Sequence, residues 1–153
     1  MLEEGQPAPD FELTSDSGAS VSLSSLRGRP VVLYFYPKDD TPGCTRQACG
    51  IRDAWDAFDE RGAVVLGVSP DGEASHVEFK AKFALPFTLL ADPEHEVAEA
   101  YGVWAERQSG DTLKWATERS TFVIDANGVL VKILRQVDPD AHASDVLAAL
   151  GET

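Results

Sequence analysis

The stretch "PVVLYFYPKDDTPGCTRQACGIRDAWDAFDERGAVVLGVS", residues 30–69, has the pattern of a strand, a helix and a second strand. Its two ends, residues 30–36 and 63–69, are continuous apolar runs, which are typical of strands buried on both faces of a sheet. Between them, apolar or small residues recur over residues 44–58 at spacings of four, three, four and three. This spacing predicts an amphipathic helix that ends near Arg61. A unit of this length predicts two parallel strands joined by a crossover helix.

The segments on either side of this unit complete an α/β pattern. Upstream, "DFELT" (10–14) and "ASVSL" (19–23) are separated by a Ser-Asp-Ser-Gly turn and predict an N-terminal hairpin. Downstream, "STFVID" (120–125) and "VLVKIL" (129–134) flank Asn-Gly, the strongest short hairpin signal. "ASDVLAAL" (143–150) then predicts a closing helix.

A helix-strand-helix portion is expected between the crossover unit and the last hairpin. A helix is predicted from about Pro70 to Ala84, a short strand over residues 87–91, and a second helix that begins at Asp92 and Pro93. A parallel unit followed by a hairpin and a helix is the thioredoxin-like arrangement. We therefore expect an α/β, thioredoxin-like three-layer fold with an N-terminal β-hairpin and this inserted portion.

Length and charge narrow the class of protein. The chain has 153 residues and is 43% hydrophobic, which fits one domain over residues 1–153. Its net charge is −13, so nucleic acid and anionic membrane surfaces are not expected partners. No basic segment followed by an apolar stretch opens the chain, and no run approaches the roughly 20 apolar residues that span a bilayer. We therefore expect a soluble, cytoplasmic protein.

The two cysteines, Cys44 and Cys49, follow a Thr41–Gly43 turn at the start of the expected crossover helix. A free thiol is only a few per cent ionised at neutral pH, whereas unpaired N–H groups in a first helical turn favour the thiolate. Cys44 also lies on the apolar stripe, where burial opposes ionisation. A cation is therefore needed, and Arg119, directly before the expected strand 120–125, is the candidate.

Other interpretations of the cysteines stay open at this level. Free cysteine is among the most buried residue types, so both could be small core residues. Five helical residues turn through about 500°, which puts Cys49 roughly 140° away from Cys44 and off its stripe. A zinc site is disfavoured, because the chain has no CxxC or HxxxH spacing and its histidines are scattered. Those histidines are His76, His95 and His142.

Residues 37–44, "PKDDTPGC", have the PxxxTxxC pattern of peroxiredoxins. The chain resembles the bacterioferritin comigratory protein, or PrxQ, branch of that family. Further matches are "GQPAPDFEL" (5–13), "GVSPD" (67–71), "AEAYGVW" (98–104) and "ERSTFVID" (118–125), so the resemblance covers nearly the whole chain. PxxxTxxC with a downstream Arg-Ser-Thr-Phe is a highly specific combination.

The resemblance implies a thiol peroxidase that reduces hydrogen peroxide and organic hydroperoxides. Cys44 would be the peroxidatic cysteine, which attacks the peroxide and becomes a sulfenic acid. Thr41 and Arg119 would activate the thiolate and the peroxide through hydrogen bonds and positive charge. Cys49 would be the resolving cysteine, which forms an intramolecular disulfide with Cys44.

The resemblance also implies the surroundings and partners of the site. Pro37 and Pro42 would shape and shield the peroxide pocket. A thioredoxin- or glutaredoxin-like protein would reduce the disulfide, and no cofactor or metal is expected because no flavin, nicotinamide or haem motif is visible. An intramolecular resolving cysteine removes the chemical need for a dimer, so a monomer is expected.

Each supporting residue also has a plain structural interpretation. Thr41 could cap the helix, and Pro42 is common in a first turn. Arg119 could pair with Glu118 or Asp125 at the surface. Taken singly these interpretations are the commoner ones, and the order of the whole motif is what favours the peroxidase.

Two other classes of function remain as alternatives. A thioredoxin-like thiol-disulfide oxidoreductase needs CxxC, whereas Thr41 stands where its nucleophile would be. A non-enzymatic binding or holdase domain could share the fold. One stretch departs from the family pattern, with Ala116 and Thr117 where glycine and an aliphatic residue are usual. Trp104 and Trp115 in that stretch either border the pocket or pack in the core.

Overall fold

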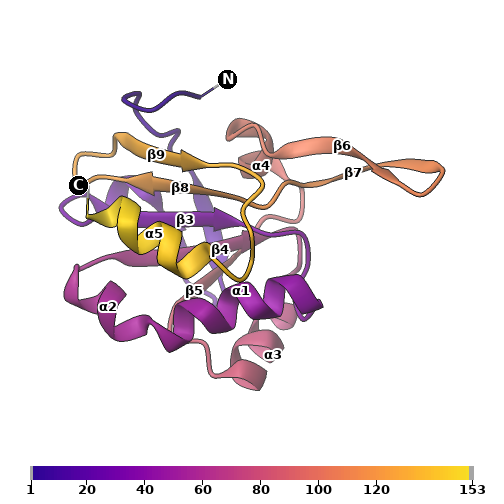
Figure 1. The fold of residues 1–153 in the computed structure, drawn as a ribbon, viewed down its shortest axis with the longest axis horizontal. Coiled ribbons are helices and arrows are strands. Elements are labelled where there is room, and N and C mark those ends of the chain that lie inside the picture. The colour runs from indigo at the N-terminus through magenta and orange to yellow at the C-terminus, as the bar shows by residue number, and fades with distance from the viewer. Residues whose placement is uncertain (1, 152–153) are drawn as a thin grey trace.

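The computed structural model describes residues 2–151, without the side chains of residues 107–109. Figure 1 shows a central sheet with helices on both sides and a two-stranded ribbon that projects from one end. The main sheet has the strand order β2-β1-β5-β4-β3-β8-β9, and β6 pairs with β7 in the projecting ribbon. The strands are β1 (Glu12–Ser15), β2 (Ser20–Ser22), β3 (Val31–Phe35), β4 (Val64–Ser69), β5 (Thr88–Ala91), β6 (Trp104–Ser109), β7 (Thr112–Thr117), β8 (Ser120–Ile124) and β9 (Leu130–Leu134).

The helices lie between and after these strands. They are the 3-10 helix η1 (Leu23–Leu26), α1 (Pro42–Asp53), α2 (Trp55–Glu60), α3 (Glu73–Phe83), α4 (Glu96–Ala100) and α5 (His142–Leu150). None of the helices within residues 2–151 is long and apolar enough to cross a membrane.

Strand β3 lies inside the sheet and is buried on both faces, as the sequence predicts. It pairs in parallel with β4, with Val31 opposite Val64, and antiparallel with β8. Its alternate side chains point to opposite faces, because successive residues of a strand do. Tyr34 belongs to the apolar cluster that contains residues of α1, α2, α3 and α5. Phe35 belongs to the cluster formed with α4 and the N-terminal segment.

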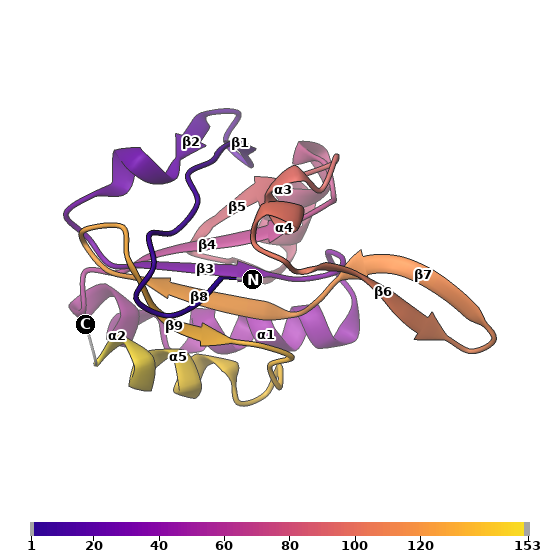
Figure 2. The same ribbon diagram turned by 90° about the horizontal axis from the view of Figure 1, so that it is seen from above.

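The expected α/β layers and both expected hairpins are present. Figure 2 shows α1 and α5 on one side of the sheet and α4 on the other. The parallel β3–α1–β4 unit, the β1–β2 hairpin, the β8–β9 hairpin and the closing helix all lie where the sequence predicts them.

The crossover helix ends near Arg61 as expected, but it is interrupted at Ala54. The Ala54 N–H is shared between the carbonyls of Gly50 and Ile51, which tightens the end of α1. The neighbouring Arg52 guanidinium donates to the carbonyl of Phe83, the last residue of α3, at 2.8 Å. α2 then restarts at a new angle, as Figure 1 shows, so α1 is a separate helix.

Two other helices begin later than the sequence predicts. α3 begins at Glu73 rather than Pro70, since Ser69 and Asp71 hydrogen-bond each other in the preceding turn. α4 begins at Glu96 rather than at Asp92 and Pro93. Asp92 nevertheless caps it, because its carboxylate accepts the N–H groups of Val97 and Ala98.

The β6–β7 ribbon was not among the predicted elements. Its strands pair from Trp104 opposite Thr117 to Ser109 opposite Thr112, around Gly110 with a φ of 63°. The ribbon projects beyond the sheet in both views, so its strands have little core to pack against.

Candidate active site

Cys44 lies in the first turn of α1 and faces the sheet. Thr41 is the N-cap residue and Pro42 is the first helical residue. Proline suits this position because the first-turn N–H groups have no helical partner. Cys44 is 2% exposed and belongs to the same apolar cluster as Ala48 and Ile51 of the stripe that the sequence predicts. The first turn of α1 lies at the end of the molecule from which the β6–β7 ribbon projects (Figure 1).

Arg119 reaches this turn from the β7–β8 junction, as its position in the sequence suggests. Its Nη2 donates to Cys44 Sγ at 3.3 Å. A Cβ on Gly43 would lie only 3.0 Å from the same nitrogen, so the absence of a side chain there lets the guanidinium approach the helix. The surface pairing considered for Arg119 is absent from its described contacts, since Glu118 instead faces Arg135, at 3.6 Å. A fixed positive charge therefore lies beside the thiol.

Gln47 is a site residue that the sequence reasoning missed. It is fully buried one turn after Cys44, and its Oε1 accepts from Arg119 Nη1 at 2.5 Å. The guanidinium is thus held at both terminal nitrogens by two residues of one helix face. The signal was available, because a polar residue three positions after Cys44 shares its side of a helix.

Thr41 lies beside the site without bonding the thiol in this state. Its hydroxyl donates to the carbonyl of Lys38 at 2.8 Å and makes no side-chain cap bond to the helix. The capping interpretation of Thr41 is therefore wrong for its side chain. Because the hydroxyl proton is engaged, the Thr41 oxygen offers lone pairs that can accept an O–H. Pro37 is half-buried and Pro42 is exposed at the same turn.

Cys49 shares α1 with Cys44, and the structure holds both as free thiols. Cys44 is buried, whereas Cys49 is half-buried, in agreement with one cysteine facing inward and the other sideways. Residues five apart in a regular helix have Cα atoms about 8.7 Å apart. A disulfide needs Cα atoms within about 7 Å, so the intact helix keeps the two sulfurs from bonding.

A buried polar cluster lies between α5 and the sheet beneath this helix. His142 Nε2 and Thr121 Oγ1 are 2.6 Å apart, and the His142 ring lies 5.4 Å from that of Tyr34. Burial, with the charge of Arg119 as a second cause, lowers the pKa of His142 to about 4. Burial, and then the charges of Cys44 and Asp39, raise the pKa of Tyr34 well above 10. His142 and Tyr34 are therefore both neutral at pH 7.

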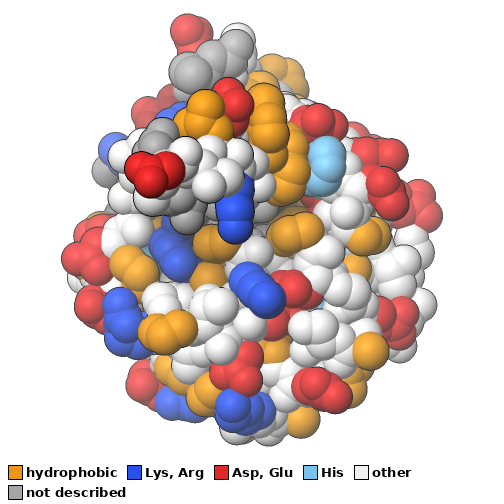
Figure 3. Space-filling view, turned by 90° about the vertical axis from the view of Figure 1, so that its right-hand side faces the viewer, with side chains coloured by type: hydrophobic (Ala, Val, Ile, Leu, Met, Phe, Trp, Pro, Cys, Tyr) orange, Lys and Arg blue, Asp and Glu red, His pale blue; other side chains and the backbone are white. Residues whose placement is uncertain are grey.

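The two tryptophans of the ribbon line a different hollow. Trp104 stacks on His95 with ring centroids 3.9 Å apart, and Trp115 stacks on Trp104. With Glu99 they line an open hollow of about 350 Å³ that none of Cys44, Thr41 or Arg119 borders. Figure 3 faces this end of the molecule and shows hydrophobic side chains gathered on the ribbon.

The described part of the chain has no cluster of side chains that could bind a metal ion. Within residues 2–151, the His, Cys, Asp and Glu side chains do not form groups of three or more able to hold a metal ion. The contact that defines the site is between a buried thiol and a guanidinium.

Comparison with known proteins gives the site its family. The model of the AhpC/TSA family matches residues 4–133. The chain belongs to the AhpC/TSA family. Among curated relatives of this family, "Putative peroxiredoxin bcp" of Coxiella burnetii is 46% identical over 97% of this chain and 99% of its own length. "Peroxiredoxin Bcp" of Bacillus subtilis is 48% identical over 97% and 95%.

Solved structures agree with this AhpC/TSA membership. The bacterioferritin comigratory protein of Xanthomonas campestris, described for its alkyl peroxide reduction activity, is 35% identical with a TM-score of 0.91, covering 97% of this chain and 98% of its own. A PrxQ mutant of Xylella fastidiosa is 32% identical with a TM-score of 0.92, covering 99% and 96%. The chain is thus a thioredoxin-like peroxiredoxin of the PrxQ branch, a thiol peroxidase.

Proposed function

We propose that Cys44 is the peroxidatic cysteine of this peroxiredoxin. The observation that carries the proposal is the 3.3 Å contact between Arg119 Nη2 and Cys44 Sγ in the first turn of α1. The thiolate attacks the distal oxygen of a hydroperoxide, the S–O bond forms and the O–O bond breaks. The sulfur is oxidised to sulfenic acid, and the other oxygen leaves as water or an alcohol once it gains a proton.

Thr41 and Arg119 hold the peroxide in this proposal. The lone pairs of the Thr41 hydroxyl accept the O–H of the hydroperoxide, because its own proton is donated to Lys38. Arg119 and the Cys44 N–H stabilise the negative charge as it moves from sulfur to the leaving oxygen. Pro37 and Pro42 border the mouth of the pocket and limit the access of water.

Cys49 resolves the sulfenic acid in the second half of the cycle. Its thiol attacks the oxidised sulfur of Cys44, the disulfide forms and water leaves. A thioredoxin- or glutaredoxin-like dithiol then reduces the disulfide and becomes oxidised itself. The intact α1 holds the cysteines too far apart, so its first turns must unwind between about Thr41 and Gly50.

The wider setting follows from the same chemistry. An intramolecular disulfide needs no second copy of the chain, so the protein works as a monomer. The reducing electrons come from another protein, so the chain needs no cofactor of its own. A cytoplasmic location suits a free-thiol pair, because cytoplasmic reductants keep thiols reduced.

The test compares Cys44→Ser with Cys49→Ser in thioredoxin- and glutaredoxin-coupled assays, using hydrogen peroxide and organic hydroperoxides. Cys44→Ser should abolish peroxide consumption, because no nucleophile remains. Cys49→Ser should keep the first oxidation, accumulate sulfenic acid and lose coupled turnover. Substantial turnover by Cys44→Ser would contradict the assignment of Cys44. Disulfide exchange without peroxide consumption by the unaltered chain would instead support the thioredoxin-like alternative.

A further inference from the structure

The loop that joins β3 to α1, residues 36–41, carries Pro37 and Thr41. It ends at the first turn of α1, which contains Cys44. Its shape is not that of relaxed chain, because Asp40 has a φ of 55°, in the left-handed region that non-glycine residues seldom adopt. Contacts from outside the loop must therefore hold it in this shape.

Asp39 is the point at which the loop is held. Its side chain is 4% exposed, and its carboxylate accepts three hydrogen bonds. Tyr36 Oη donates to Oδ1 at 2.6 Å, while Ser75 Oγ and His76 Nδ1 bond Oδ2 at 2.8 and 2.7 Å. Two of the three donors come from α3, so the carboxylate ties the loop to that helix.

His76 extends the tie from α3 to β5. The His76 ring is fully buried, and its Nε2 lies 2.9 Å from the carbonyl of Leu90. A carbonyl and a carboxylate are both acceptors, so each ring nitrogen carries a hydrogen and the ring is an imidazolium. Burial lowers the pKa of His76, but the hydrogen bond and charge of Asp39 outweigh it and the net pKa is raised. His76 and Asp39 thus form a buried ion pair.

A second contact holds the backbone of Asp39. Its N–H donates to Asp71 Oδ2 at 2.7 Å, and Ser69 Oγ donates to the same oxygen at 2.8 Å. By contrast, the tie between Asp40 and Lys82, at 2.7 Å, is a solvent-exposed ion pair. Exposed pairs contribute little, so the buried contacts of Asp39 carry the restraint.

We propose that His76 is a positioning residue for peroxide reduction, which acts through Asp39 to fix the loop that presents Thr41 to the peroxide bound at Cys44. His76 touches neither the thiol nor the peroxide in this inference. The inference rests on the proposed function, in which Thr41 and Cys44 act on the peroxide. A small error in the position of a catalytic group costs up to about a hundredfold in rate, so a buried restraint two residues away is effective.

The variants separate positioning from folding. His76→Gln removes the imidazolium and keeps one amide donor, and Ser75→Ala removes one donor from Asp39 with little risk to the fold. Lys82→Gln is the matched control, because it removes the exposed tie to the same loop. Thermal unfolding of each variant identifies any that are not folded at the assay temperature.

Two rates are measured on each variant at one pH. One is the single-turnover oxidation of Cys44 by hydrogen peroxide, and the other is the alkylation of Cys44 by iodoacetamide, which needs a thiolate but not Thr41. His76→Gln should slow the peroxide reaction about tenfold. It should change alkylation by less than about twofold, because the Arg119 contact is kept. Ser75→Ala should have a smaller effect of the same kind, and Lys82→Gln should leave both rates within about twofold.

A double-mutant comparison gives the sharpest test. If His76 acts through Thr41, the effect of His76→Gln should disappear in a Thr41→Val background. Additive losses in the double variant would overturn the inference. So would an unchanged peroxide rate in both His76→Gln and Ser75→Ala, or an equal loss of both rates in His76→Gln. These outcomes are distinct from failure of the proposed function, which would appear as an unaltered chain whose Cys44 does not react with peroxide.

Discussion

Arg119 and Cys44 are 75 positions apart in the sequence, yet Arg119 Nη2 lies 3.3 Å from Cys44 Sγ. The contact depends on two structures at once. The pairing of β8 with β3 brings Arg119 to this edge of the sheet, and the helical winding of α1 turns the thiol toward it. The contact between this guanidinium and the thiol therefore exists only while the first turn of α1 is wound.

Replacing Arg119 by methionine should slow the oxidation of Cys44 by peroxide about ten- to a hundredfold. The loss of one charge-assisted hydrogen bond is worth about 1.5–3 kcal/mol, which corresponds to this range. The fraction of Cys44 present as thiolate at neutral pH should fall with the rate. Stopped-flow oxidation and ultraviolet thiolate absorbance measure the two effects. Arg61→Met is the control, because the Arg61 guanidinium, at the end of α2, donates to the carbonyl of Ala57 in that helix. Unchanged thiolate absorbance in Arg119→Met would show that another group activates Cys44.

Replacing Gln47 by leucine should slow the same step without unfolding the protein. Gln47 Oε1 holds Arg119 Nη1, whereas its Nε2 is buried and has no hydrogen-bond partner among the residues that the structure describes. Leucine removes this unpaired donor but also the acceptor of Arg119 Nη1, so the loss of rate, about tenfold, should come with a loss of stability of about 1–3 kcal/mol. Rapid-mixing kinetics and urea unfolding of the same sample test this pair of effects. A rate equal to that of the unaltered chain would mean that Arg119 needs no support from Gln47.

Oxidation should unwind the start of α1 and leave α2 in place. The disulfide cannot form across an intact helix, so amide hydrogens of residues 44–50 should lose protection when Cys44 and Cys49 are joined. α2 should stay protected, since Trp55 stacks on Phe58 and packs against Phe87. Hydrogen exchange with mass spectrometry on both redox forms measures this. Cys49→Ser treated with peroxide serves as the control that cannot form the bond. Equal protection in the two forms, with the disulfide confirmed by mass, would contradict the unwinding.

His142 should make the fold less stable in acid. Its folded-state pKa is about 4, below the ordinary 6.5, so the unfolded chain binds the proton more readily. Stability from this residue is fully present above pH 6.5, falls as the pH drops toward 4 and is lost below it. The difference in pKa corresponds to roughly 3 kcal/mol at most.

His142→Gln provides the measurement. The difference in free energy of unfolding between the unaltered chain and this variant should shrink by that amount between pH 7 and pH 4. Taking the difference cancels the contribution of His76, whose raised pKa acts in the opposite direction, stabilising below pH 6.5 and fading as the pH rises through the folded-state pKa. A difference that does not vary with pH would show that His142 is not buried in its neutral form.

The central part of the fold could be predicted because its signals are local. Continuous apolar runs identify β3 and β4, and the spacing of apolar residues identifies α1 between them. The meeting of Cys44 with Arg119 could also be expected, since each lies at the end of a predicted element at one edge of the sheet. The catalytic roles of the site residues all remain predictions, namely those of Cys44, Cys49, Thr41, Arg119, Pro37 and Pro42.

The rest depends on contacts between distant segments, which leave no local pattern. The interruption at Ala54 coincides with a contact from Arg52 to the carbonyl of Phe83, 31 positions away. Asp39 and His76 are 37 positions apart, and neither residue belongs to a sequence pattern that would predict their contact. Leu113 and Trp115 of the β6–β7 ribbon are exposed. The ribbon strands therefore lack a buried face, which is what gives a strand a regular alternation of apolar and polar residues.

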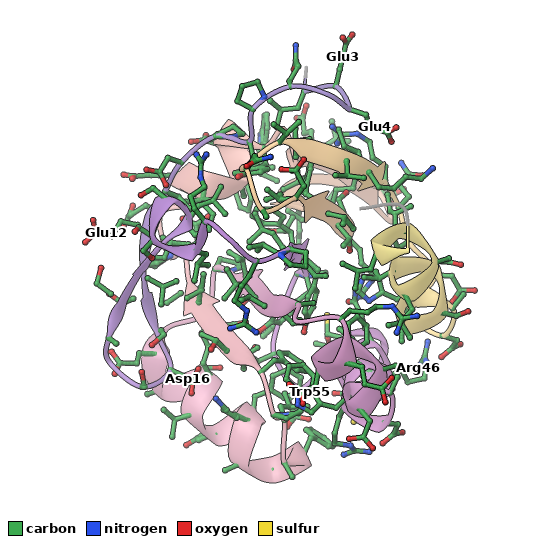
Figure 4. The ribbon with its side chains drawn as sticks, turned by 90° about the vertical axis from the view of Figure 1, so that its left-hand side faces the viewer. Glu3, Glu4, Glu12, Asp16, Arg46 and Trp55 are labelled. Carbon is green, nitrogen blue, oxygen red and sulfur yellow. The ribbon has the colours of Figure 1, made fainter. Side chains whose placement is uncertain are left out.

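A surface ion pair of α1 differs from the contact between Arg119 and Cys44 in its exposure to solvent. Arg46 projects outward from α1, as Figure 4 shows, and forms an ion pair with Asp140 at 2.9 Å. Both side chains are more than half exposed, so this pair adds little to the stability of the wound helix. The charge beside the thiol is that of Arg119, which is half-buried.

The interruption at Ala54 also bears on the timing of the catalytic cycle. It makes α1 a separate helix of 12 residues, so unwinding has a built-in end point and rewinding involves few residues. Helices of this size form within about a microsecond, and loops of about ten residues close in less than that. A typical enzyme turns over about ten times per second, so rewinding takes a negligible share of each cycle. In the proposed cycle, the pace of turnover is then set by bond-making at sulfur and by encounters with the reducing protein, and α1 resets between them without delay.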